Sequence, residues 1–199
     1  MLMSNFSDSN FEAGVDEAGR GSLAGPLTAA AVILPKNYKN QALNDSKKLS
    51  EKKRFQLKSI IEKDSIDFAV FFIAPSIIDK INILNSTYKA MHGALSNLKI
   101  IPSFIIVDGN RFQKFKNINH SCIVKGDTKY QSIAAASVLA KTYRDSYMID
   151  QHSRFPVFGW DKNKGYGTES HIKNINEHGM SELHRKSFFI KKSQTKLQL

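Results

Sequence analysis

Apolar runs bounded by glycine, proline and polar clusters divide the chain into short strands and longer helices. The first run covers residues 13–16, and a Gly-rich turn separates it from a continuous apolar run at 27–34. Short apolar runs with such boundaries are typical of buried strands. The pattern therefore predicts a hairpin at the start of the chain. Further strands are predicted at 66–74, 101–107 and 121–124.

Between and after these strands, the spacing of apolar residues favours helices. Over residues 84–98 they recur at intervals of three and four, which predicts one helix face that packs on the sheet. Ser76 and Asp79 have the spacing of a capping box at the start of that helix. Thr168 predicts the N-cap of a helix that ends before Gly179. Helices are predicted at 46–63, from 75 onward, at 130–152 and at 168–178, with a short piece from 181.

The order of these elements predicts one α/β domain. A hairpin followed by strands alternating with helices favours a mixed sheet. A chain of 199 residues is long enough for one well-buried core. We therefore expect a single domain at 11–190, preceded by a flexible tail at 1–10 and followed by a basic tail at 191–199.

The composition favours a soluble cytoplasmic protein. No apolar run approaches the ~20 residues of a membrane span, and the first ten residues lack the apolar core of a signal peptide. The single cysteine, Cys122, excludes an internal disulfide framework and fits a reducing compartment. We expect Cys122 to be a small core residue.

The charge is unevenly distributed and favours a polyanionic partner. The formal net charge is +11, and the residues after Asn110 contribute 16 of the 29 basic side chains but 7 of the 18 acidic ones. A basic excess concentrated in one part of a chain is typical of nucleic-acid binding. A surface that only maintains solubility would have the same charge, so the charge alone leaves both interpretations open.

Four carboxylates lie where predicted strands end or a helix is about to begin. Asp16 and Glu17 lie at the end of the first strand, Asp108 ends the fourth, and Asp127 precedes a helix. Each acid alone could cap a helix or a turn. Converging together they would repel one another, and bound divalent cations would remove that conflict. Oxygen ligands select Mg²⁺ or Mn²⁺, whereas the six histidines show no zinc-binding spacing.

An ordered set of motifs resembles the bacterial branch of the type 2 ribonucleases H (ribonuclease HII). The signature is Asp16-Glu17-Ala18-Gly19-Arg20-Gly21, and the resemblance extends over about residues 13–190. Each motif alone is weak, but the set in this order is specific. The further motifs lie at 44–50, 107–110, 125–127, 134–141, 164–168 and 184–188.

The resemblance implies a fold and a set of site residues. The fold is ribonuclease H-like, with a five-stranded mixed sheet flanked by helices and a helical C-terminal part. The four carboxylates match the catalytic metal site, which implies two Mn²⁺ or Mg²⁺ ions. Ser22 stands where the family pattern predicts proline, and we expect it to loosen the preceding turn slightly. Gly19, Arg20, Gly21 and Tyr166 match residues that read 2′-hydroxyls near the cut, and Lys47, Lys48, Lys125 and Lys164 are candidate phosphate contacts.

The activity implied by the resemblance is an endoribonuclease. Such an enzyme cleaves the RNA strand of RNA–DNA hybrids and nicks duplex DNA 5′ to an embedded ribonucleotide, leaving 5′-phosphate and 3′-hydroxyl ends. We expect a monomer that acts in DNA replication and repair. A type 3 ribonuclease H usually has an N-terminal DNA-binding domain, for which residues 1–10 leave no room. A non-catalytic hybrid-binding protein and a related nuclease with another substrate, such as a DNA junction, are the two competing interpretations.

Overall fold

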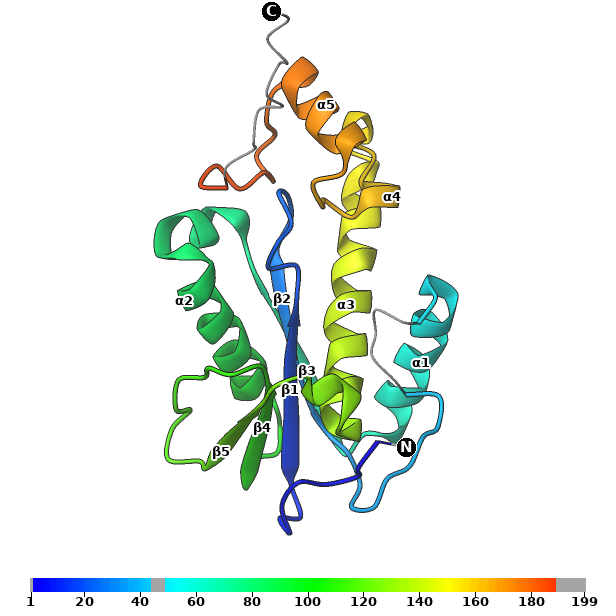
Figure 1. Cartoon of the computed structure of the whole chain (residues 1–199), viewed down its shortest axis with the longest axis vertical. Coiled ribbons are helices and arrows are strands. Elements are labelled where there is room, and N and C mark those ends of the chain that lie inside the picture. Colours follow the sequence, from blue (N-terminus) through cyan, green and yellow to red (C-terminus); the bar gives the residue numbers. More distant parts are fainter. Residues whose placement is uncertain (1, 44–48, 189–199) are drawn as a thin grey trace, which may run out of the picture.

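A five-stranded mixed sheet forms the centre of the molecule, with helices on both faces (Figure 1). The computed structural model describes residues 2–43 and 49–188. The strand order is β3-β2-β1-β4-β5; β1 pairs antiparallel with β2 and parallel with β4. This architecture confirms the predicted fold class. The strands are β1 (Glu12–Ala18), β2 (Leu27–Ile33), β3 (Asp67–Ile73), β4 (Phe104–Asp108) and β5 (His120–Ile123).

Two apolar layers hold the helices against the sheet. Helix α2 packs on one face, where Met91 and Leu95 join a buried cluster with residues of β1 and β2. Helices α1 and α3 pack on the other face, and the run of small residues at 134–136 lets α3 approach the strands closely. The long helices are α1 (Glu51–Asp64), α2 (Pro75–Ser96) and α3 (Gln131–His152).

The C-terminal part extends the α3 side beyond the end of the sheet (Figure 1). Trp160 and Phe158 fill a separate small core there with Met148 of α3. The predicted cap is confirmed, because the Thr168 hydroxyl accepts a hydrogen bond from the amide of His171. The short elements are η1 (Gly126–Thr128), η2 (Pro156–Phe158), α4 (Trp160–Asn163) and α5 (Glu169–His178). Residues 181–188 form turns, so the short helix predicted from 181 is wrong.

Two predictions about α2 are wrong for physical reasons. The backbone at Asn82 is non-helical (φ 65°, ψ 169°), which resets the periodicity and leaves Leu84 at the surface. The N-cap is Ala74, which makes no side-chain cap bond, so there is no capping box. The Asp79 carboxylate instead accepts hydrogen bonds from the amides of Lys186 and Ser187.

Two further expectations fail at the edges of the sheet. Cys122 lies exposed on the edge strand β5 and is not a core residue. Residues 2–10 do not form a loose tail, because Met3 exchanges backbone hydrogen bonds with Lys129 and Gln131, and Phe6 stacks on Phe104. The predicted tail at 191–199 lies outside the described residues. In the described part of the chain, no helix has the length and apolarity needed to cross a bilayer.

Gly14 sets the close approach of β1 to α3. A β-carbon at Gly14 would lie 2.3 Å from the carbonyl carbon of Ser132, which is backbone and cannot move aside alone. We predict that Gly14→Ala lowers the free energy of unfolding by about 1–3 kcal/mol, the usual cost of overpacking. Gly21→Ala is the matched control, because no atom lies within 4 Å of its β-carbon position. Urea denaturation checks the pair, and equal stability of the two variants would contradict this packing.

Candidate active site

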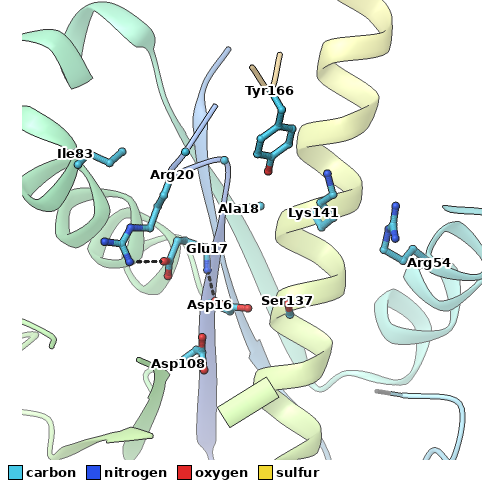
Figure 2. A pocket seen from close by; sticks show the side chains of 12 residues that line it. Asp16, Glu17, Ala18, Arg20, Arg54, Ile83, Asp108, Ser137, Lys141 and Tyr166 are labelled. Atoms are coloured by element: carbon cyan, nitrogen blue, oxygen red, sulfur yellow. Dashed lines mark hydrogen bonds and ion pairs between the residues drawn. The ribbon is translucent and has the colours of Figure 1, made fainter. Parts of the chain in front are cut away.

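Parallel pairing of β1 with β4 brings carboxylates from distant parts of the chain together. Val15 pairs with Val107, so the next residues, Asp16 and Asp108, lie side by side near the carboxyl ends of the two strands, and β1 itself continues to Ala18. Glu17 follows on the same strand. Figure 2 shows the three carboxylates on one side of a cavity of about 600 Å³. The sheet therefore fixes the acidic side of the cavity.

Burial and like charges dominate the electrostatics of this side. The Asp16 side chain is buried, and its Oδ1 accepts a 2.7 Å hydrogen bond from the amide of Glu17. Burial raises the pKa of Asp16 well above its usual value, and the charges of Glu17 and Asp108 raise it further. A hydrogen bond with Ser137 acts in the opposite direction. Burial and the two neighbouring carboxylates therefore disfavour the charged form of Asp16.

The other two carboxylates are held by different partners. Glu17 lies 3.3 Å from the guanidinium of Arg20, an ion pair that is largely exposed on the Arg20 side. The Oδ1 atom of Asp108 accepts a 2.7 Å hydrogen bond from the amide of Gly126 at the start of η1. Asp127 is buried in η1, next to that contact, but it does not line the cavity. Three of the four predicted acids therefore line one cavity, and the fourth, Asp127, is not among its lining residues.

The donor set fits a hard divalent cation, although the side chains are not arranged as a finished metal site. Across residues 2–43 and 49–188, no group of three His, Cys, Asp or Glu side chains is arranged so that it could hold a metal ion. The cavity offers carboxylate oxygens, and these suit Mg²⁺ or Mn²⁺. Glu17 would exchange Arg20 for the ion. A cation would also relieve the repulsion that raises the pKa of Asp16.

The predicted substrate-contacting turn and tyrosine line the same cavity. Gly19, Arg20 and Gly21 lie along its rim, and Gly19 has a left-handed backbone (φ 90°) that favours glycine. Tyr166 directs its hydroxyl toward the cavity from the loop before α5 (Figure 2). Its ring lies 5.1 Å from the ammonium of Lys141. The two motifs, 145 positions apart in sequence, thus face one space.

The predicted lysine contacts are less uniform. Lys164 is buried, and its ammonium contacts the carbonyl of Asp161 and, at 3.4 Å, the carboxylate of Glu51. Lys164 does not line the cavity, and its ammonium contacts other protein groups instead. Lys125 is exposed, with a left-handed backbone, and also lies outside the cavity. Lys47 and Lys48 lie outside the described residues.

Two basic side chains missed by the sequence reasoning line the opposite side of the cavity. Arg54 comes from α1 and Lys141 from α3, and both pair with the buried Asp145, at 3.8 Å and 2.7 Å. Ser137 lies one turn before Lys141 on the same helix face (Figure 2). The spacing of Ser137, Lys141 and Asp145 at intervals of four is the signal that could have identified this face.

Comparison with known proteins identifies the family. A family model described as ribonuclease HII matches residues 13–192. The chain belongs to the ribonuclease HII family. It is therefore an enzyme, a metal-dependent hydrolase that acts on RNA.

Relatives and solved structures agree with this membership. Ribonuclease HII of Bacteroides fragilis is 53% identical over 188 residues, which are 94% of each chain. The ribonuclease H2 crystal structure from Pyrococcus horikoshii OT3 has a TM-score of 0.74 at 26% identity and covers 89% of this chain and 93% of that one. Bst-RNase HIII in complex with Mn²⁺ shares the fold, with a TM-score of 0.68 at 20% identity over 90% of this chain and 67% of that one.

A buried histidine pair supports the Tyr166 loop of this ribonuclease HII chain. Nδ1 of His171 lies 2.9 Å from the carbonyl of Tyr166, and its Nε2 accepts from the indole of Trp160 at 3.1 Å. Nε2 of His184 lies 3.2 Å from the same Nε2 of His171. Nδ1 of His184 accepts from the amide of Ser181. These contacts require both rings to be neutral, with the Nδ1 proton of His171 donated to Tyr166.

The stability of this region should depend on pH. Burial, followed by the neighbouring His171, lowers the pKa of His184 to about 4. In the unfolded chain a histidine titrates near 6.5, so between pH 6.5 and 4 the unfolded state binds a proton that the folded state does not. We predict that the contribution of neutral His184 to the free energy of unfolding is fully present above pH 6.5 and declines as the pH falls toward 4.

Urea denaturation of the wild type and His184→Gln between pH 4 and 8 checks this. Glutamine keeps a polar group of similar reach but does not titrate, so the variant lacks the histidine's pH dependence. The stability advantage of the wild type should narrow below pH 6.5. A difference between the two proteins that is constant across this range would contradict a neutral buried pair.

Proposed function

We propose that this chain cleaves the RNA strand of RNA–DNA hybrids and nicks duplex DNA 5′ to an embedded ribonucleotide. The products would have 5′-phosphate and 3′-hydroxyl ends. The observation that carries the proposal is one cavity bordered by Asp16, Glu17 and Asp108, by the Gly19–Gly21 turn and by Tyr166. The acids suit phosphodiester hydrolysis with divalent cations, and the turn and tyrosine suit recognition of a 2′-hydroxyl.

Divalent cations complete the site in this proposal. Asp16, Glu17 and Asp108 would hold them, with Asp127 contributing from η1. Two Mn²⁺ or Mg²⁺ ions are the expected number, and the Mn²⁺ complex of the structurally similar Bst-RNase HIII supports this class of ion. When bound, such ions supply charge stabilisation to an in-line displacement at phosphorus and a nucleophile at neutral pH.

The protein groups position the substrate in this scheme. Glycines in the 19–21 turn let backbone amides and carbonyls approach the sugar, which distinguishes RNA from DNA through the 2′-hydroxyl. Lys141 and Arg54, both oriented by Asp145, would contact backbone phosphates across the cavity from the acids. Lys47, Lys48 and Lys125 remain proposed phosphate contacts farther along the duplex. Lys164 would first have to leave Asp161 and Glu51.

The biological role follows from this chemistry. We propose a cytoplasmic monomer that removes ribonucleotides and RNA primers during DNA replication and repair. A protein that only binds hybrids would explain the positive charge equally well. It would not explain why mutually repelling carboxylates, one of them buried, border the cavity where phosphate would lie.

Replacing one acid at a time tests the proposal. We predict that Asp16→Asn or Asp108→Asn abolishes cleavage of a duplex with a single ribonucleotide, because each change removes a metal ligand. Binding of the duplex should be retained or tightened, because each also removes a negative charge that faces phosphate. Cleavage and fluorescence anisotropy, each with Mn²⁺, measure the two properties.

Asp150→Asn is the matched control, because Asp150 is exposed at the end of α3 and outside the cavity. It should cleave and bind as the wild type does. Near-normal turnover of either cavity variant at saturating Mn²⁺ would contradict the assignment of the acids. Loss of cleavage in the control as well would show that the effect is not specific to the cavity.

A further inference from the structure

A buried arginine lies beneath the turn and the tyrosine. Arg144 of α3 has no exposed surface, and its Nε donates a 2.9 Å hydrogen bond to the carbonyl of Pro26. Its Nη1 donates to the carbonyl of Lys164 at 2.9 Å, and its Nη2 to that of Ala24 at 3.0 Å. One guanidinium therefore joins the loop after β1 to the loop that carries Tyr166.

Ser22 extends this network into the Gly19–Gly21 turn. Its buried hydroxyl accepts a 2.7 Å hydrogen bond from Nη2 of Arg144 and donates a 2.9 Å bond to the carbonyl of Gly19. The sequence pattern predicts that serine in place of proline loosens the turn. In the structure the hydroxyl instead connects the turn to Arg144. Hydrogen bonds, rather than a proline ring, therefore restrict the turn.

The same guanidinium also contacts both recognition motifs directly. It lies over the Tyr166 ring, 5.1 Å from the ring centre. A β-carbon on Gly19 would lie 2.1 Å from its Nε, so the turn can sit this close only because residue 19 is glycine. The position of the turn and the position of the tyrosine thus depend on one side chain.

We propose that Arg144 and Ser22 are positioning residues that fix the Gly19–Gly21 turn relative to Tyr166 and so set the rate of cleavage at an isolated ribonucleotide relative to that within a continuous hybrid. The inference rests on the proposed function. An isolated ribonucleotide offers one 2′-hydroxyl, so the turn and the tyrosine must meet the same sugar. A continuous hybrid offers neighbouring 2′-hydroxyls, which tolerate a small displacement of either group.

Ser22→Ala is the informative variant because it removes one hydroxyl and leaves Arg144 in place. We expect its kcat/KM to fall about tenfold on a duplex with one ribonucleotide, the scale of one lost buried hydrogen bond, and by less on a continuous hybrid. Thr142→Val is the matched control. Its buried hydroxyl, also on α3, donates only within the helix, to Val138 and Leu139. Its two kcat/KM values should keep the wild-type ratio.

A double-mutant cycle with Tyr166→Ala separates positioning from general loosening. If Ser22 acts by aligning the turn with the tyrosine, Ser22→Ala should change the substrate ratio much less once the tyrosine is gone. Arg144→Lys keeps the charge but loses the planar fork, and it should shift the ratio in the same direction as Ser22→Ala. If Arg144→Lys does not fold, the double-mutant cycle of Ser22→Ala with Tyr166→Ala tests the positioning role by itself.

The outcomes distinguish this inference from the proposed function. A wild type that cleaves neither substrate with Mn²⁺ would overturn the proposed function itself. An active wild type with an unchanged substrate ratio in Ser22→Ala would overturn only the positioning role. Fully additive effects of Ser22→Ala and Tyr166→Ala on the ratio would overturn it too. A ratio shift in Ser22→Ala that disappears in the Tyr166→Ala background would support it.

Discussion

The pairing of β1 between an antiparallel and a parallel neighbour is the constraint on which the site depends. Parallel pairing with β4 places Asp16 and Asp108 side by side near the carboxyl ends of these strands. The antiparallel hairpin with β2 returns the chain at once, so the 19–26 loop must lie over that edge. The acids and the turn are therefore neighbours because of the backbone topology. Their mutual repulsion is the cost of this arrangement, and the divalent cations that we propose at this edge would relieve it.

The cavity has two chemically different sides, and each is fixed by a different part of the fold. Strand ends supply the acids, whereas α1 and α3 supply Arg54 and Lys141 through their shared partner Asp145. The Arg20–Glu17 pair crosses the rim, and Arg20 is 55% exposed. Exposed pairs of this kind contribute about 0–1 kcal/mol, so the proposed transfer of Glu17 from Arg20 to a metal ion would cost little stability. The free arginine would then be available to phosphate.

The sequence was sufficient to predict the strands, and three of the four acids that it singled out line the cavity. Acids near the carboxyl ends of two strands lie close together when those strands are parallel neighbours. Local patterns were therefore enough to locate Asp16, Glu17 and Asp108. Features set by distant contacts could not be found this way. The backbone break at Asn82, the binding of Asp79 to the 186–187 amides and the pairing of Lys164 with Glu51 all depend on tertiary structure. The role of Ser22 became visible only from its hydrogen bond with Arg144, 122 positions away.

We propose that this edge of the sheet hydrolyses a phosphodiester bond beside a ribonucleotide. The most direct measurement is cleavage by the purified wild type of a DNA duplex with one ribonucleotide, beside an all-DNA duplex of the same sequence, with and without Mn²⁺. We expect a nick only in the ribonucleotide-containing strand, 5′ to that residue, with 5′-phosphate and 3′-hydroxyl ends and only when Mn²⁺ is present. Equal cleavage of the all-DNA duplex, or cleavage that persists after metal is removed with a chelator, would contradict it.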